Sequence, residues 1–292
     1  MRLPLLDLEL DNPLRNPEVD AAGTRVLITG ASGTFGRAIT AELTRRGAQV
    51  VGLDLAPRED DLVPVIASDL ASDESVAAAV PEAIERLGGG LEILINNAGI
   101  SAPTPAEFPP TDAVMAQLQI NLLGTWRVSA ACVQSLVASR GRVVMVASRM
   151  AVMQLPLAAA YGVSKRAMVG YADALRLELH PFVGVSCVYP SQVRSPIHDS
   201  VKAAGLSLEG MSVYESLDGV VAAVVRAALS EKVIRDVSTT RRGRMEFLMA
   251  RHNPEFVDRK IARTLAERVR SGAFDRAELA RGVVARLGGD GT

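Results

Sequence analysis

Apolar residues along the first two hundred positions gather into short runs that are separated by longer, mixed stretches. Runs rich in valine, isoleucine and leucine, bounded by glycine or polar residues, are typical of buried strands. Six such runs predict strands at residues 24–30, 48–55, 63–70, 91–100, 141–148 and 183–190.

The stretches between these runs carry apolar residues at helical spacing. They predict a helix after the glycine-rich segment at 30–36, a capped helix at 72–90, a long helix over about 110–138 and another over 158–180. Strand and helix therefore alternate, which predicts an α/β fold: a doubly wound parallel sheet with helices on both faces. The carboxyl ends of its strands should meet at one edge, where such sheets bind ligands.

Composition narrows the possible functions. The chain has 292 residues, of which 48% are hydrophobic, and its net charge of −1 gives no electrostatic reason to expect nucleic acid binding. Cys132 and Cys187 lie in apolar runs and the three histidines are far apart in sequence, so we expect no metal site. No apolar run reaches the length of a membrane span, and acidic residues interrupt the N-terminal leucines, unlike a signal peptide. A reducing cytoplasm is the expected location.

The chain divides into three parts. Residues 1–23 form an N-terminal extension, residues 24–240 the main α/β domain, and residues 241–292 a basic, helical C-terminal extension. One interpretation of this last part is an amphipathic helix for a membrane surface or a partner. We favour a solvated helix that packs on its own domain or on a second subunit.

The segment TGASGTFG joins the first predicted strand to a helix and predicts a phosphate site. Gly30, Gly33 and Gly36 let the backbone approach a ligand, and the free N–H groups of the first helical turn face negative charge. Asp54 ends the second strand, about 20 residues further on, where a carboxylate accepts from ribose hydroxyls. A carboxylate there would repel a 2′-phosphate, which favours NAD over NADP. Arg58 is the residue that could reverse this preference.

A second group of polar residues begins at Ser148 and ends at Lys165. Tyr161 and Lys165 are four positions apart, so both side chains share one face of a helix. We expect the ammonium group to lower the pKa of the phenol, which suits acid/base chemistry near neutral pH. Ser148, at the end of the fifth strand, could hold a carbonyl or alcohol oxygen against that phenol.

Together these segments resemble the short-chain dehydrogenase/reductase family, in its short single-domain, steroid- or retinol-dehydrogenase-like form. The matching pieces span about residues 24–200 in the family order: TGASGTFG, Asp69-Leu70, NNAG at 96–99, Asn121, Ser148, YGVSK at 161–165 and the loop that follows Pro190. The resemblance implies a Rossmann-type fold, with residues 24–240 as the dinucleotide-binding catalytic domain, a nicotinamide cofactor, and hydride transfer to or from a secondary alcohol or ketone. We also expect a homo-oligomer, either a dimer or a tetramer.

The resemblance also implies individual roles. Tyr161 would be the acid/base, Lys165 its pKa modifier and a ribose contact, Ser148 the holder of the substrate oxygen, and Asn121 the carrier of a water that links Lys165 to solvent. The residues that would contact the cofactor are Gly30, Ser32, Gly33, Thr34, Phe35, Gly36, Asp54, Asp69, Leu70, Asn97, Ala98, Gly99, Tyr161, Lys165, Pro190, Val193 and Ser195.

Two positions depart from the family pattern. Thr34 stands where short members usually have the middle glycine, a spacing commoner in the extended members, so we expect a slightly altered turn and retained binding. Ser191 follows Pro190 where glycine is usual, which concerns loop flexibility more than chemistry.

Apolar residues near Ser148 and after Pro190 predict a lipophilic substrate of steroid, retinoid or long-chain type, because such a wall leaves the polar groups of a sugar or acid unsatisfied. The competing interpretations are a core role for these residues and an anion site at Arg149 and Arg194. The apolar residues are Met150, Val152, Met153, Leu155 and Leu157, then Ile197, Val201, Leu206, Leu208, Met211 and Val213.

Two other functions compete with hydride transfer. One is a catalytically silent dinucleotide sensor or scaffold. The intact set of serine, tyrosine, lysine and asparagine argues against it, because a protein that only binds a dinucleotide needs no phenol/ammonium pair. The other is an epimerase or dehydratase of the extended branch. That branch usually adds a larger C-terminal domain, for which we expect residues 200–292 to be too short.

Overall fold

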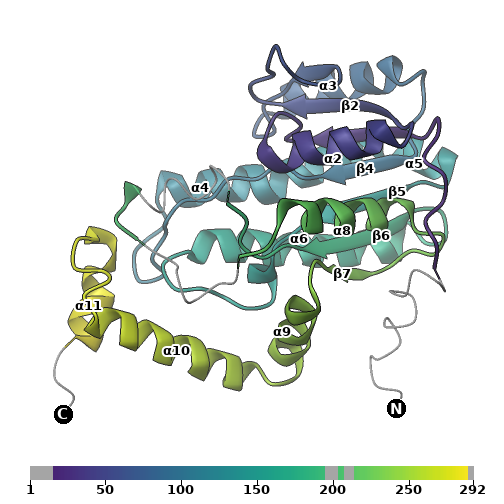
Figure 1. Ribbon diagram of the computed structural model, residues 1–292. Helices are drawn as coiled ribbons and strands as arrows, with labels where there is room; N and C mark the ends of the chain where they lie inside the picture. Colours follow the sequence, from purple (N-terminus) through teal and green to yellow (C-terminus); the bar gives the residue numbers. More distant parts are fainter. Residues whose placement is uncertain (1–15, 195–202, 207–213, 289–292) are drawn as a thin grey trace.

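The computed structural model describes residues 16–194, 203–206 and 214–288. Seven parallel strands form one sheet in the order β3-β2-β1-β4-β5-β6-β7, with helices on both faces (Figure 1). The predicted doubly wound, Rossmann-type α/β fold is confirmed. The strands are β1 (Arg25–Thr29), β2 (Gln49–Asp54), β3 (Val65–Ala67), β4 (Ile93–Asn96), β5 (Arg142–Val146), β6 (Gly184–Tyr189) and β7 (Asp236–Ser238).

Two apolar cores, one on each face, hold the helices on the sheet. One core joins the strands to α2 (Thr34–Arg45) and α8 (Leu217–Leu229). The other joins them to α3 (Asp73–Arg86), α5 (Thr125–Ser139) and α6 (Ala159–Glu178). Parallel strands covered on both faces need apolar side chains on both sides, which explains why the strands appear as continuous apolar runs in the sequence.

Several predicted elements are shorter than expected because polar residues leave the sheet at its ligand-binding edge. The strand predicted over 63–70 covers only β3, and the one predicted over 91–100 covers only β4. The helix predicted over 110–138 is in fact α4 (Asp112–Leu118), a π-helical segment (Gln119–Gly124) and α5. A π-helical turn inside a longer helix is frequent at functional sites.

The C-terminal helices α9 (Arg241–His252), α10 (Pro254–Arg270) and α11 (Arg281–Leu287) form an arm that extends from the sheet (Figure 1). Phe247 of α9 enters the core and packs edge-to-face on Tyr189 at 4.9 Å between ring centroids. Further along the arm, Val269 and Phe274 join Leu155 and Leu157 in a third apolar cluster. Among the described residues, no helix is long and apolar enough to cross a membrane.

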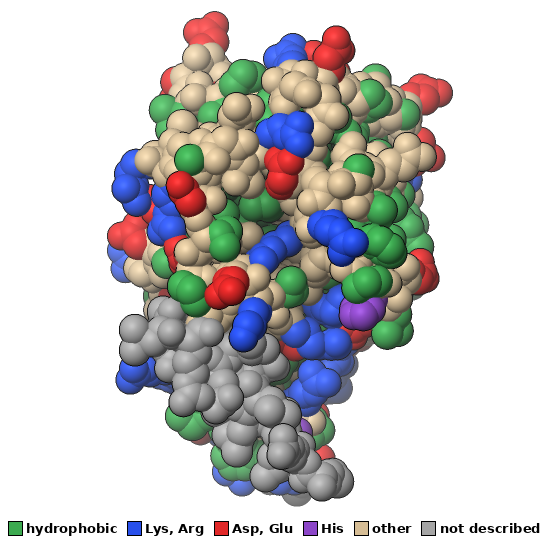
Figure 2. All heavy atoms as spheres, turned by 90° about the vertical axis from the view of Figure 1, so that its right-hand side faces the viewer, with side chains coloured by type: hydrophobic (Ala, Val, Ile, Leu, Met, Phe, Trp, Pro, Cys, Tyr) green, Lys and Arg blue, Asp and Glu red, His purple; other side chains and the backbone are tan. Residues whose placement is uncertain are grey.

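The N-terminal residues that the structure describes run along the opposite end of the molecule. Asn16 exchanges two hydrogen bonds with the backbone of Lys232, and Glu18 forms an isolated β-bridge with Ser230. On the face shown in Figure 2, acidic and basic side chains lie interspersed, as the small net charge suggests.

Candidate active site

The glycine-rich turn leaves β1 and enters α2 as a close backbone loop. Gly30 has a positive φ of 67°, which favours glycine. A Cβ on Gly36 would lie 2.0 Å from the Gly30 carbonyl oxygen, so that helix turn can pack on the loop only without a side chain. Gly33 caps α2 and no side chain caps the helix there, which leaves the first N–H groups of α2 available to an anion.

A cavity of about 510 Å³ opens in front of this turn. Asp54, at the end of β2, lies in its wall and accepts hydrogen bonds from the backbone N–H groups of Ser32 (3.0 Å) and Ala56 (3.1 Å). The predicted cofactor residues in its wall are Gly30, Gly33, Thr34, Phe35, Asp54, Asp69, Leu70, Asn97, Ala98 and Gly99. Ser32 and Gly36 shape the turn from behind that wall, and Ser195 is outside the described residues.

Two buried polar atoms at this cavity are left without a hydrogen-bond partner among the described residues. Asn97 donates through Nδ2 to the Thr29 carbonyl (3.0 Å), whereas its Oδ1 has no partner. The hydroxyl of Ser68, also in the wall, has none. Buried polar atoms normally have partners, so these two fit a ligand that brings its own donors. A dinucleotide fits these features together: the glycine-rich turn, the free N–H groups at the start of α2, the Asp54 carboxylate and the two unpaired polar atoms.

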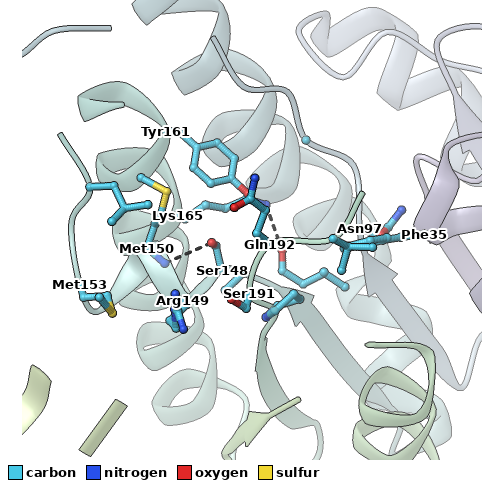
Figure 3. Close-up of a pocket in the computed structure, with 16 residues that line it drawn as sticks. Phe35, Asn97, Ser148, Arg149, Met150, Met153, Tyr161, Lys165, Ser191 and Gln192 are labelled. Atoms are coloured by element: carbon cyan, nitrogen blue, oxygen red, sulfur yellow. Dashed lines mark hydrogen bonds between the residues drawn. The ribbon is translucent and has the colours of Figure 1, made fainter. Parts of the chain in front are cut away.

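A smaller cavity of about 100 Å³ adjoins the first and holds the predicted catalytic side chains. Ser148, Tyr161 and Lys165 line it, and Phe35, Asn97 and Gly99 line both cavities (Figure 3). Ser148 follows β5, and Tyr161 and Lys165 lie in the first two turns of α6. The tertiary fold therefore brings the three residues together in the wall of the smaller cavity.

The hydroxyl of Ser148 and the ammonium of Lys165 are held by backbone groups. Ser148 Oγ accepts from the Met150 N–H at 3.1 Å, and Lys165 Nζ donates to the Val146 carbonyl at 2.9 Å (Figure 3). Lys165 Nζ lies 6.0 Å from the centroid of the Tyr161 ring. The predicted common face of Tyr161 and Lys165 is thus present.

The pKa of Tyr161 differs from the expectation. Burial raises the pKa of the phenol above its ordinary value of 10.0, and a hydrogen bond with Ser148 lowers it in part. Burial also lowers the pKa of Lys165 from 10.5 to about 8. The expected lowering of the phenol pKa by the ammonium is wrong for this structure, because desolvation of the phenol outweighs the attraction of an ammonium whose proton the Val146 carbonyl engages.

Asn121 lies in the π-helical segment and is completely buried. Its Nδ2 donates to the Ile100 carbonyl (2.9 Å) and to Ser164 Oγ (3.0 Å), while its Oδ1 accepts from the Ile100 N–H (2.8 Å). The exposed or capping role considered for an asparagine in this helix is therefore wrong. Asn121 fixes the segment that carries Gly99, next to which both Asn121 and Lys165 lie.

The substrate side of the smaller cavity is largely apolar. Met150, Met153 and Leu155 line it, as the sequence predicts, whereas Leu157 lies behind it in the third apolar cluster. Arg149 also lines the cavity, but its guanidinium is 7% exposed and forms an ion pair with Glu246 of α9. Ile197, Val201, Leu208, Met211 and Val213 are outside the described residues, and Leu206 belongs to the third cluster.

The loop after β6 closes the other side. The Pro190 carbonyl accepts from the Arg149 N–H at 2.9 Å, the Ser191 N–H donates to Glu215, and Val193 is buried in the wall. Sequence reasoning missed Gln192, whose buried Oε1 has no partner among the described residues. It also missed Ser68 and Ile100, which a simple rule would have found: both directly adjoin predicted residues at strand ends.

A family model described as short chain dehydrogenase matches residues 24–205. The 3-ketodihydrosphingosine reductase of Bacteroides thetaiotaomicron is 33% identical over 178 residues, which are 60% of this chain and 66% of that protein. Retinol dehydrogenase 7 of Rattus norvegicus is 34% identical over 183 residues, covering 59% of this chain and 57% of its own length. The chain thus spans less than two thirds of these two relatives. It covers 73% of the oxidoreductase UcpA of Escherichia coli K12, at 31% identity.

Solved structures share the fold. The ligand-free aldohexose dehydrogenase of Thermoplasma acidophilum superposes with a TM-score of 0.68 at 23% identity, over 76% of this chain and 94% of that one. A short chain dehydrogenase of Burkholderia cenocepacia, solved in complex with NADP, gives a TM-score of 0.69 at 24% identity, over 83% of this chain and 99% of its own.

Proposed function

Because this chain belongs to the short-chain dehydrogenase family, we propose that it transfers a hydride between a nicotinamide dinucleotide and a secondary alcohol or ketone. The observation that carries the proposal is the meeting of the two cavities. The dinucleotide-sized cavity and the apolar cavity share Phe35, Asn97 and Gly99, and Ser148 and Tyr161 line the apolar cavity. A silent sensor would need the first cavity but not the second.

Within this proposal, each catalytic side chain has a defined task. Tyr161 gives its phenol proton to the substrate oxygen during reduction and takes it back during oxidation. Ser148 donates a hydrogen bond to the same oxygen and holds it in place. Lys165 would hold a ribose hydroxyl of the dinucleotide, and its pKa of about 8 suits a group that holds or releases a proton near neutral pH. The nicotinamide ring supplies or accepts the hydride when the dinucleotide is bound.

We propose NAD as the preferred cofactor, with NADP as the weaker ligand. Asp54 lies in the wall of the larger cavity with one end of its carboxylate on the glycine-rich turn. A carboxylate there accepts from ribose hydroxyls and repels a 2′-phosphate. Titrating both cofactors by calorimetry tests this preference, and equal or tighter binding of NADP would contradict it.

We propose a lipophilic substrate of steroid, retinoid or long-chain type. Met150, Met153 and Leu155 supply the apolar wall, and flexible methionines suit ligands of irregular shape. Arg149 is a poor anion site because Glu246 already neutralises it. A screen at 340 nm over hydroxysteroids, retinoids and long-chain and small alcohols tests the class. A highest kcat/KM for a polyol or carboxylate would contradict it.

We further propose a cytoplasmic homo-oligomer. Three large apolar side chains on α4, α5 and α6, namely Met115, Trp126 and Val163, are each about half exposed, and a second subunit packed on these helices would cover them. Sedimentation of the full chain tests the assembly.

The decisive experiment replaces the proton donor. Tyr161→Phe keeps the ring and removes only the hydroxyl, so turnover should fall by about 10²–10⁴-fold. Dinucleotide affinity, measured by calorimetry, should stay within about threefold of wild type, because Tyr161 lines the smaller cavity and not the larger one. Near-wild-type kcat in this variant would overturn the assignment of Tyr161.

A matched control is available on the same helix. Tyr171, on α6 as well, stacks on Trp126 at 4.3 Å between ring centroids and lines neither of the two cavities. Tyr171→Phe should leave kcat nearly unchanged. An equal loss in both variants would indicate a general effect on α6 instead of lost acid/base chemistry.

A further inference from the structure

A charged cluster lies between the glycine-rich turn and the loop that joins β2 to β3, residues 55–64. Its centre is Asp61, whose side chain is only 6% exposed. Asp61 accepts from Ser32 Oγ at 2.5 Å, from the Arg58 N–H at 2.7 Å and from Arg37 Nη1 at 3.0 Å. The loop is thereby fastened to the turn and to the first turns of α2.

The neighbouring carboxylate completes the neutralisation of both basic residues. Asp60 accepts from Arg37 Nη2 at 3.0 Å and from Arg58 Nε at 3.2 Å. Both terminal nitrogens of the Arg37 guanidinium therefore point at carboxylates, the same fork geometry with which arginine binds phosphate. The guanidinium of Arg58, the residue expected from the sequence to reverse the cofactor preference, is engaged by Asp60, while its backbone N–H donates to Asp61.

Ser32 connects the cluster to the wall of the dinucleotide cavity. Its hydroxyl donates to Asp61, and its backbone N–H donates to Asp54 Oδ2 at 3.0 Å. Burial alone would raise the pKa of Asp61, but hydrogen bonds from Ser32 and from the Arg58 backbone bring it below the ordinary value of 3.8. Asp61 is therefore ionised at neutral pH. Counted with Asp54, which Ser32 links to it, the cluster holds three carboxylates and two guanidinium groups and therefore carries one net negative charge.

We propose that Asp60 and Asp61 are specificity-determining residues, which exclude a 2′-phosphate by occupying Arg37 and Arg58. This inference rests on the proposed dinucleotide function and extends it beyond Asp54. A 2′-phosphate would bring further negative charge to a net negative cluster, whose two cations already have partners. With both acids neutralised, the cluster would carry a net charge of +1, and the Arg37 fork would become available to a phosphate.

The test compares affinities for NAD and NADP by calorimetry in the full chain. Asp60→Asn/Asp61→Asn should bind NADP at least tenfold more tightly than wild type and NAD within threefold. Adding Arg37→Ala should abolish that gain, because the freed guanidinium supplies it. Adenosine 2′,5′-bisphosphate and 5′-AMP, titrated as a pair, should reproduce the same shift without the nicotinamide half.

Two further variants keep the test decisive if Asp61→Asn fails to fold. Asp60, with its side chain 64% exposed, can be neutralised alone, and Asp60→Asn should still improve NADP affinity severalfold. Glu59→Gln removes an exposed acid from the same loop and should leave the NADP/NAD affinity ratio within twofold of wild type. An unchanged ratio in Asp60→Asn and in the double variant, or an equal shift in Glu59→Gln, would overturn the inference.

The wild-type ratio and the change in that ratio answer different questions. A wild type that prefers NADP would contradict the proposed cofactor preference, while the shift caused by Asp60→Asn/Asp61→Asn still decides the role of the cluster. If neither wild type nor any variant bound either dinucleotide, both the proposed dinucleotide function and the proposed role of the cluster would be overturned.

Discussion

The two cavities that meet at Asn97 differ in the parts of the chain that form their walls. The larger one is made by backbone: a glycine-rich turn, the start of α2 and the ends of β2, β3 and β4. The smaller one is made by side chains from segments far apart in the chain, Met150 to Leu155 and Pro190 to Val193, supported from behind by the C-terminal arm. The larger cavity should therefore be disturbed by any side-chain atom added to its glycine-rich turn. The smaller cavity should instead be disturbed by the loss of side chains that pack behind its wall.

Removing packing behind the smaller cavity should have the largest effect. Phe274 is 2% exposed and packs in the third cluster with Leu155 and Leu157. Phe274→Ala should lower the free energy of unfolding by about 3–5 kcal/mol, the usual cost of emptying such a site. It should also raise KM for the lipophilic substrate, since Leu155 lines the cavity.

Phe256 provides the matched control for this change. It lies on α10 of the same arm but is 44% exposed. Phe256→Ala should cost much less, about 1 kcal/mol at most, and leave KM unchanged. Urea denaturation of both variants makes the comparison. Equal losses would mean that the arm does not support the cavity wall.

Adding one methyl group to the glycine-rich turn should have the next largest effect. A Cβ on Gly36 would meet the backbone at 2.0 Å from the Gly30 oxygen, so Gly36→Ala should lose about 3 kcal/mol of stability, the upper end of overpacking costs. A Cβ on Gly33 would lie 3.4 Å from that oxygen, an ordinary contact. Gly33→Ala should therefore unfold close to the wild-type midpoint, and similar midpoints for both variants would refute the steric argument.

The smallest effect concerns the residue between the two cavities. Burial depresses the folded-state pKa of Lys165 from 10.5 to about 8, so at neutral pH the group stays charged and the buried ammonium opposes stability. The unfolded chain binds more protons between pH 8 and 10.5, so this penalty fades as pH rises through that window. Lys165→Met removes the penalty at all pH values but leaves the Val146 carbonyl without its donor.

The stability difference between Lys165→Met and wild type should therefore depend on pH. The free energy of unfolding of the variant minus that of wild type should fall by about 2 kcal/mol between pH 7 and pH 9.5. The reason is that wild type loses its penalty over this range, and one pKa unit corresponds to about 1.4 kcal/mol. Denaturant titrations at both pH values measure the difference. A difference independent of pH would show that Lys165 keeps an ordinary pKa in the fold.

Much of the fold was predictable because its signals are local. Six of the strand positions follow from runs of apolar residues, since each strand of a covered parallel sheet must be apolar on both sides. The glycine-rich turn was also predictable from the sequence, because a strand, a tight turn and a helix start that follow one another are determined by adjacent residues. The ends of the elements were less predictable, as at Asp69 and Asn97, where polar residues leave the sheet without any sharp change in the sequence pattern.

The sequence by itself determined the alternation of strands and helices, the phosphate-type turn, and the pairing of Tyr161 with Lys165 on one helical face. Only the tertiary structure decided how strongly burial shifts the pKa values of Tyr161 and Lys165, because desolvation depends on everything packed around a group. It also decided that Asp61, which in the sequence is one acid in an ordinary polar loop, is buried against Ser32 and Arg37. Such contacts join residues more than twenty positions apart, so their chemistry exists only once the sheet has brought the loop and the turn together.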